Sequence, residues 1–327
     1  MVATVGRGAI PLGALALLAA TGCDPAATDA AAEASTAARP ASASSAPAAS
    51  ISASAAPDAM AAKACEPGCL SIERCEGGRC LPACPDGEVY VPATGPKGFT
   101  MGGELVEPLP ARGHQVILSR PFCMDATEVT VAAYRACVDA TICDPARTWG
   151  MWINYPKLSD HPVNKVHYDH AKAYCAWRSQ SLPSEAQWEW AASGGDGRMW
   201  PWGNETPTCV HADFTPGNLS GPSSDDGCHG GGTSPVGSHP QGDRVWPNGR
   251  IHDLSGNVWE WCLDNHLKLG SAPETDPVHA TLPNGARVVR GGGWNRSGRG
   301  IRVDYRAGAP IDYQVPGLGF RCVRNPE

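Results

Sequence analysis

The sequence predicts an α+β fold with little regular secondary structure, held together by disulfide bonds and tryptophan packing. Segments with a clean helical or strand periodicity are few. Glycine and proline, which interrupt helices and strands, make up 38 and 30 of the 327 residues, and 11 tryptophans and 14 cysteines are spread along the chain. In an exported protein such cysteines form disulfides that stabilise loop-rich structures. We therefore expect short elements joined by irregular segments.

A few segments are regular enough to assign. A strand is predicted at residues 115–118, and helices at residues 130–139 and 169–178. In the second of these helices Ala171, Tyr174 and Cys175 follow the i, i+3, i+4 spacing that places side chains on one face. That face is the one we expect to be buried.

The clearest helix begins after Ser184. Ser184 and Gln187 match a capping box, in which the serine hydroxyl accepts a hydrogen bond from the N3 amide and the glutamine side chain reaches back. Glu185 lies in the first turn, where the helix dipole favours a negative charge. Gly194 and Gly195 are expected to end the helix, because glycine adopts the left-handed conformation of a C-cap.

The first residues are typical of a bacterial lipoprotein signal peptide. In residues 1–23, Arg7 precedes an apolar run at 9–20, and small residues lead up to Cys23. We expect cleavage and lipidation at Cys23, and hence a protein exported to the cell envelope and lipid-anchored to a bacterial membrane; an ordinary secretory signal cut nearby is the alternative. No later apolar run approaches the roughly 20 residues of a membrane-spanning helix.

Three regions follow the signal. Residues 24–64 are mostly Ala, Ser, Pro and Thr without an apolar face, which predicts a disordered tether. Residues 65–84 form a small cysteine-rich module, in which we favour disulfides over a zinc site because the protein is exported. Its cysteines, whose pairing the sequence does not determine, are Cys65, Cys69, Cys75, Cys80 and Cys84. Residues 85–327 are expected to form one domain.

Charge argues against a nucleic-acid partner. The formal net charge is −7 at pH 7, and Lys and Arg do not gather in a basic patch. Binding to nucleic acid depends on basic side chains that neutralise phosphates. We therefore expect no nucleic acid among the partners.

Four stretches, in this order, resemble one family. They are FTMGG (99–103) with FCMDATEVT (122–130); HPVNKV (161–166) through AKAYCAW (171–177) and LPSEAQWEWAA (182–192) to PWGNE (201–205); DLSGNVWEW (253–261); and RVVRGGGW (287–294) with GLGFRC (317–322). Together they resemble the domain of the formylglycine-generating enzyme, or sulfatase-modifying factor, over residues 88–324. The resemblance implies a fold related to C-type lectins and a disulfide between Cys175 and Cys322.

The resemblance also implies a chemistry whose ligands this chain lacks. Active members of the family oxidise a cysteine of a sulfatase with oxygen and a copper ion held by two cysteines, and soft thiolates suit Cu(I). The corresponding run, residues 291–302, contains no cysteine, and none occurs between Cys262 and Cys322. Three arginines place positive charge where the metal would bind: Arg296, Arg299 and Arg302. We therefore expect no catalytic residues and no copper.

Structural calcium is a further expectation from the resemblance, because carboxylate and carbonyl oxygens suit Ca²⁺. One set of ligands would be Asp253, the carbonyls of Gly256 and Val258, and Glu260. A second set would be Asp213, the carbonyl of Phe214, Asp226 and the carbonyl of Cys228. The alternative at each place is a hydrogen-bonded loop without metal.

Other reactive side chains have structural interpretations. Cys209 with Cys228, and Cys137 with Cys143, are candidate disulfides that the sequence alone does not secure. The histidines and the carboxylate pair of the third helix are interpreted as capping, surface or packing residues, since no third metal ligand is recognisable beside them. They are His161, His167, His170, Glu185 and Glu189.

An intact framework with an altered catalytic position favours a binding function. We expect a non-catalytic lipoprotein that binds an unknown protein, peptide or glycan. The cleft would lie at Trp294, where Arg296, Arg299 and Arg302 suit an acidic ligand. The alternative is an oxidoreductase of the formylglycine-generating family, or other chemistry in the same cleft.

Overall fold

The computed structural model describes residues 73–76, 79–103, 113–217, 224, 226–283 and 285–326. The predicted signal peptide with Cys23, the predicted tether at 24–64, and Cys65 and Cys69 lie outside the described residues. Within the described part of the chain, no helix is long and apolar enough to cross a membrane.

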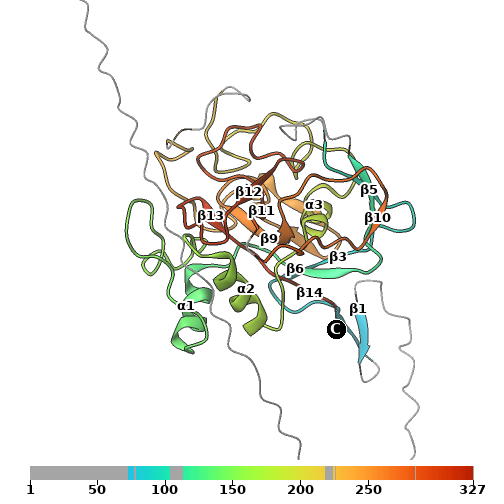
Figure 1. The fold of residues 1–327 in the computed structure, drawn as a ribbon, viewed down its shortest axis with the longest axis horizontal. Helices are drawn as coiled ribbons and strands as arrows, with labels where there is room; N and C mark the ends of the chain where they lie inside the picture. Colours follow the sequence, from blue (N-terminus) through green and yellow to red (C-terminus); the bar gives the residue numbers. More distant parts are fainter. Residues whose placement is uncertain are drawn as a thin grey trace, which may run out of the picture. The chain divides into compact units, whose positions relative to one another are not determined.

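The elements are short, and loops occupy much of the fold (Figure 1). The helices are α1 (Val131–Asp139), α2 (Tyr168–Trp177) and α3 (Glu185–Ser193), with a 3-10 turn at Pro240–Gly242. The strands are β1 (Glu73–Glu76), β2 (Arg79–Pro82), β3 (Glu88–Val91), β4 (Phe99–Met101), β5 (His114–Ile117), β6 (Phe122–Asp125), β7 (Arg244–Trp246), β8 (Gly249–Ile251), β9 (Trp259–Asn265), β10 (Glu274–Thr275), β11 (Arg287–Arg290), β12 (Arg306–Ala309), β13 (Leu318–Gly319) and β14 (Val323–Arg324). The expected α+β fold with little regular secondary structure is confirmed.

The helices form where the sequence predicts them. Thr130 caps α1 by accepting a hydrogen bond from the Ala133 amide. The capping box of α3 is complete: the Gln187 amide donates to Ser184 Oγ at 3.1 Å, and Gln187 Oε1 accepts from the Ser184 amide at 2.9 Å. Gly194 ends α3 in the left-handed region, with φ 64°. The predicted strand at 115–118 is observed one residue earlier, as β5.

A four-stranded sheet of order β12-β11-β9-β13 lies at the centre of the fold. Successive side chains of a strand point to opposite faces. Trp261 and Val289 therefore pack into the apolar core with α1 and α2, whereas Cys262 and Val288 pack into a second core with α3. We call these the α2 face and the α3 face of the central sheet. Smaller sheets of order β10-β5-β4 and β14-β6-β3 and the hairpin β7-β8 surround it.

Four disulfides among the described residues hold the loops and short elements together. They are Cys84–Cys123, Cys137–Cys143, Cys175–Cys322 and Cys209–Cys228. The first was not anticipated: Cys84, assigned by sequence proximity to the cysteine-rich module, is bonded to β6 of the large domain. Cys175–Cys322 joins α2 to the chain just before β14, across 147 residues of sequence. Cys262 is a buried free thiol.

Candidate functional site

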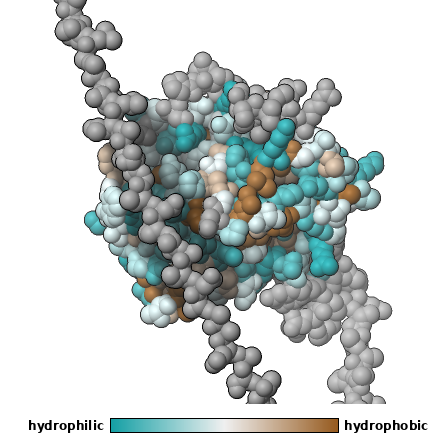
Figure 2. Space-filling view, viewed as in Figure 1, coloured by the Kyte–Doolittle hydropathy of each residue, from teal (hydrophilic) through white to brown (hydrophobic). Residues whose placement is uncertain are grey.

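A cavity of about 670 Å³ lies beside Trp294, on the α2 face of the central sheet. This volume falls within the roughly 300–1,000 Å³ of small-molecule sites. We call it the Trp294 cavity. Its lining residues are Met151, Trp152, Trp259, Val289, Trp294, Asn295, Arg296, Ala307, Gly308, Ala309, Pro310, Tyr313, Val315, Pro316, Gly317 and Leu318. Seen from the direction of Figure 1, apolar side chains gather over the central strands, with hydrophilic side chains around them (Figure 2).

The turn after β11 positions Trp294. Gly291 and Gly292 have φ values of 86° and 75°, a conformation that L side chains rarely adopt. A Cβ at Gly292 would lie 2.5 Å from the Gly300 carbonyl oxygen, so the turn has no room for one. The Trp294 amide donates to the Asn257 carbonyl at 2.9 Å. The indole is consequently held at the cavity, only 1% exposed.

Two irregular loops contribute two of the walls of the cavity. Met151 and Trp152 belong to one wall, and Tyr313 and Pro316 to the other. Met151 is 69% and Tyr313 48% exposed, so each wall presents a large apolar side chain to solvent. Trp152 packs edge-on against the Trp294 ring, with ring centroids 5.6 Å apart.

Asn164 fixes both walls at once. Its side-chain Nδ2 donates to the Trp152 carbonyl at 2.9 Å and to the Pro316 carbonyl at 2.7 Å, and its Oδ1 accepts from the Asn154 amide at 3.1 Å. Asn164 is 1% exposed. A buried amide with all three bonds made sets the distance between the two loops. It belongs to the HPVNKV stretch, but the sequence did not reveal this role.

The cavity carries few polar side chains. Among the residues that the structure describes, those lining it include no Cys, His, Asp or Glu. Besides the indoles, Asn295, Arg296 and Tyr313 supply its polar groups. The Arg296 guanidinium lies 5.7 Å from the Trp259 ring centroid, in cation–π range. Within the described residues, this lining offers apolar contact, one positive charge and, in Tyr313, a single side chain of the kinds that commonly act in acid–base or nucleophilic catalysis.

The three arginines expected at the cleft lie in different places. Arg296 lines the cavity, whereas Arg299 and Arg302 are absent from its lining. Arg302 instead makes two hydrogen bonds of 2.8 Å to Asp304. Residues 296–302 form a succession of turns, so side chains close in sequence point in different directions. The spacing of the arginines in the sequence therefore could not predict which of them line the cavity.

The residues that line the Trp294 cavity do not suit the copper ion that active members of the formylglycine-generating family use. Copper in that chemistry needs two thiolates, and no cysteine lines the cavity among the described residues. The free thiol, Cys262, lies on the α3 face and is fully buried. Burial raises the pKa of this thiol well above its ordinary value, so it stays protonated and is a poor metal ligand. We derive no reaction step through copper.

At the first proposed calcium loop, the carboxylates of Glu260 and Asp253 already bind other groups of the protein. Both oxygens of Glu260 bind Arg321, at 2.7 and 2.8 Å, and one also accepts from Trp188 Nε1 at 2.7 Å. Asp253 Oδ2 accepts from the Gly237 amide at 2.6 Å. As arranged, Glu260 does not fit as a calcium ligand, because a cation would have to displace a buried guanidinium.

At the second proposed calcium loop, protein hydrogen bonds also hold the buried carboxylate. Asp213 Oδ2 accepts from Ser234 Oγ at 2.8 Å, and Oδ1 from the Cys228 amide at 3.4 Å. Asp226 is exposed. The backbone links this loop to the first one, since the Asn257 amide donates to the Asp213 carbonyl at 2.8 Å. Calcium therefore remains a prediction from the resemblance, and we assign it no role.

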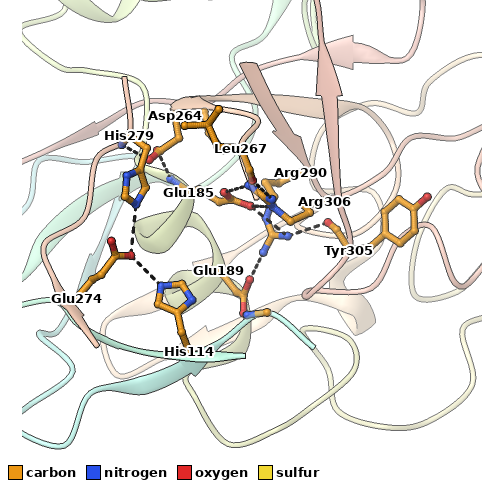
Figure 3. Close-up of polar contacts among 12 residues, drawn as sticks. His114, Glu185, Glu189, Asp264, Leu267, Glu274, His279, Arg290, Tyr305 and Arg306 are labelled. Atoms are coloured by element: carbon orange, nitrogen blue, oxygen red, sulfur yellow. Dashed lines mark hydrogen bonds and ion pairs between the residues drawn. The ribbon is translucent and has the colours of Figure 1, made fainter. Parts of the chain in front are cut away.

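The α3 face is, by contrast, dense in charge (Figure 3). Glu185 binds Arg306 through both oxygens at 2.6 Å, and Glu189 pairs with Arg290. Burial raises the pKa of Glu189 to about 7 despite Arg290. For Glu185 burial acts in the same sense, but Arg306 outweighs it and the pKa is lowered. These pairs link α3 to β11 and β12, in agreement with the structural role expected of both glutamates.

A smaller polar group extends this network. Glu274 Oε2 contacts His114 Nε2 at 3.0 Å and His279 Nε2 at 3.3 Å, which connects β10 with β5 (Figure 3). Asp264 accepts from the amides of Glu185 and His279, both at 2.7 Å. Among the described residues, no group of three His, Cys, Asp or Glu side chains is placed to hold a metal ion.

His161, His167 and His170, which are interpreted from the sequence as structural or surface residues, do not line the cavity. His167 precedes α2 without a side-chain capping bond, and its ring stacks on His170 at 4.8 Å. His170 contacts Asp144 at 3.2 Å, and His161 bonds Thr233 at 2.9 Å. Each has a local structural contact.

Comparison with known proteins agrees with this architecture. The family described as the sulfatase-modifying factor enzyme 1-like domain matches residues 84–326. The chain is 35% identical over 175 residues to the inactive C-alpha-formylglycine-generating enzyme 2 of Mus musculus, covering 49% of this chain and 48% of that protein. It is 32% identical over 286 residues to the formylglycine-generating enzyme of Streptomyces coelicolor, covering 70% of this chain and 87% of that enzyme.

Among solved structures, PvdO from Pseudomonas aeruginosa has the same fold, with a TM-score of 0.56 and 24% identity. The match covers 74% of this chain and 95% of PvdO. The chain spans about half the length of the mammalian relatives from Mus musculus and Bos taurus.

Proposed function

This chain belongs to the sulfatase-modifying factor enzyme 1-like family, and we propose that it is an exported, lipid-anchored member that binds a ligand in the Trp294 cavity and does not oxidise cysteine. The lining of the cavity carries this proposal. The cavity is large enough for a ligand, but the described residues that line it include none of the thiols that the copper chemistry of the family requires.

The rest of the framework supports binding. The Trp294 turn and the Asn164 bridge brace the residues that line the cavity. A site with a fixed shape loses little entropy when a ligand enters, which favours affinity. One relative at 35% identity is itself described as inactive, so loss of the oxidase activity on this scaffold has a parallel.

The lipid anchor is proposed from residues 1–23, in which Cys23 follows an apolar run and small residues. Expression of the full chain in a bacterium with radiolabelled palmitate tests it. Wild type should incorporate label and sediment with membranes, whereas Cys23→Ser should incorporate none. Label retained by the variant would contradict lipidation at this residue.

The absence of oxidase activity is tested directly. Purified protein, reduced and supplied with Cu(I) and oxygen, is incubated with a sulfatase-type peptide containing Cys-x-Pro-x-Arg. We expect no aldehyde by mass spectrometry and no stoichiometric copper after desalting. The Streptomyces coelicolor enzyme serves as the positive control. Aldehyde formation by this chain would overturn the non-catalytic proposal.

A further inference from the structure

The loop that joins α1 to α2 exposes large apolar side chains. Within the described residues, Trp149 and Met151 are 67% and 69% exposed, and Ile142 and Leu158 of the same loop are exposed as well. In Figure 1 this loop lies at the margin of the fold, beside α1. An isolated apolar side chain in solvent is ordinary, whereas several together indicate an interaction site.

Tyr313, from a second loop, borders the same cavity as Met151. Only Gly150 separates Met151 from Trp149 in the sequence. Tyr313 is 48% exposed, so it adds a third large side chain to the solvent-facing edge of the cavity. We call Trp149, Met151 and Tyr313 the rim patch.

The backbone that carries Trp149 and Met151 is fixed on both sides. Lys165 Nζ donates to the Trp149 carbonyl at 3.1 Å, and the Arg147 amide donates to the Lys165 carbonyl at 3.4 Å. On the other side of Met151, the Trp152 carbonyl is held by the Asn164 bridge. A braced loop therefore presents these side chains to solvent, and their exposure is a property of the fold.

Basic side chains accompany the rim patch. Residues 142–158 contain Arg147 and Lys157 against one acidic residue, Asp144, which gives this segment a formal charge of +1 in a chain of −7. The Arg147 guanidinium lies 3.2 Å from the Trp149 ring centroid. Among the described residues no carboxylate pairs with Arg147 or Lys157, and both are at least partly exposed. Such cations beside an exposed indole suit the phosphate groups of a lipid surface.

From these observations we infer that the rim patch is a membrane-contact surface: its three side chains enter the interfacial layer of a phospholipid bilayer, while Arg147 and Lys157 meet lipid phosphates. This inference rests on the proposed lipid anchor and specifies which face of the domain lies against the membrane.

The proposed anchor favours a bilayer over a partner protein as the occupant. A lipidated Cys23 would be joined to the rest of the chain by the predicted tether at 24–64, and a coil of that length spans roughly 35 Å. A membrane would therefore always be within reach of the domain. Trp and Tyr are enriched at the membrane–water interface, and apolar side chains that lie in the interface are buried by about 5–10 Å.

Hydroxyl-radical footprinting with mass spectrometry tests the contact. The lipidated protein in vesicles of phosphatidylcholine and phosphatidylglycerol is compared in buffer with a secreted form that starts at residue 24 and keeps every described residue. The side chains of the rim patch should be oxidised at least about threefold more slowly in vesicles, because the interface shields them from radicals formed in water. Val245 of β7 and Val278 after β10 are 55% and 52% exposed and belong to other parts of the fold, so their rates should not change.

Two matched variants place the contact at the rim patch. Met151→Asp puts a carboxylate into it, which anionic lipid repels and the interface does not bury, so Trp149 should lose its protection in vesicles. Val245→Asp makes the same change at an exposed position of the β7-β8 hairpin and should leave Trp149 protected. Both positions are exposed, so neither change should unfold the protein.

Three results would overturn the inference. Equal oxidation of the rim patch in the two forms would exclude membrane contact, and loss of protection in Val245→Asp would show that charge anywhere on the domain has the same effect. Protection in intact cells but not in vesicles would identify a partner protein instead. The palmitate experiment separates these failures from failure of the proposed anchor: wild type without label has no anchor, whereas a labelled chain with an unprotected rim patch refutes this inference alone.

Discussion

The two faces of the central sheet use the same strands for opposite purposes. On the α3 face, Arg290 of β11 and Arg306 of β12 pair with glutamates of α3 inside the protein. On the α2 face, Val289 of β11 and Ala309 of β12 border an open cavity in which, among the described residues, Arg296 is the one lining arginine. The alternation of side chains along a strand separates the two environments by one residue. Charge is thus concentrated where it stabilises the fold, and the accessible face is left apolar for a ligand.

The strongest way to break this comparison is to remove one arginine from each environment. Arg321 is fully buried and binds both oxygens of Glu260. Arg321→Met leaves that carboxylate buried without its cation, which should lower the free energy of unfolding by about 3–5 kcal/mol. The measurement is urea unfolding followed by tryptophan fluorescence with disulfides intact.

Arg296→Met is the matched substitution in the cavity. Because Arg296 is partly accessible, its loss should change stability by less than about 1 kcal/mol. Similar losses for the two variants would show that the arginine of the cavity is also structural, and would remove the distinction between the faces.

The two glutamates of α3 should give opposite pH dependences of stability, although both lie on the charged α3 face. Burial raises the pKa of Glu189 to about 7 from the ordinary value of 4.5. Between these pH values the folded state holds a proton that the unfolded chain has released, so stability falls as pH rises through them. Relative to Glu189→Gln, wild type should lose up to about 3 kcal/mol between pH 4.5 and 7.5, measured by urea unfolding at each pH.

Glu185, one turn earlier, should have the opposite slope. Burial acts on it too, but the ion pair with Arg306 lowers its pKa below the ordinary value. Its contribution to stability is present above that ordinary value and is lost as pH falls through the lowered pKa. Wild type should therefore lose stability relative to Glu185→Gln on acidification below about pH 4.5. Slopes of the same sign for the two variants would contradict this assignment.

Local sequence patterns predicted the elements, and the family motif predicted a cleft at Trp294, but neither predicted the walls of the cavity. The capping box at Ser184 and the cap at Thr130 act through neighbours three residues away, so they can be recognised in the sequence itself. The cavity walls are irregular loops around Trp152 and Tyr313, which meet only through a third segment at Asn164. No periodicity marks such segments, and their approach depends on the whole fold.

The individual site residues also show that sequence patterns do not predict contacts that depend on the whole fold. Trp294 and Arg296, which line the cavity, were predicted as cleft residues because they lie in or directly after the motif that carries the family resemblance. Arg302, in the same run, turned out to bind Asp304, because a sequence of turns has no fixed side-chain direction. That the buried Trp294 Nε1 lacks an acceptor among the described residues is a fact of three-dimensional packing without a local sequence signal.

A moderate effect on stability, but a decisive one for the cavity, is expected at Asn164. Asn164→Ala removes the donor that holds the Trp152 and Pro316 carbonyls, at a cost of about 1–3 kcal/mol. Asn154→Ala is a suitable control, because it also deletes a buried amide from the same region, one bonded to Pro162 and Thr233 rather than to both walls. Stability should fall similarly in the two variants under urea unfolding. Affinity for toluene, measured by ligand-detected NMR, should fall at least fivefold in Asn164→Ala alone, since only that variant releases the two loops from each other. Equal losses of affinity would mean that the cavity depends on general stability rather than on the spacing that Asn164 sets between its walls.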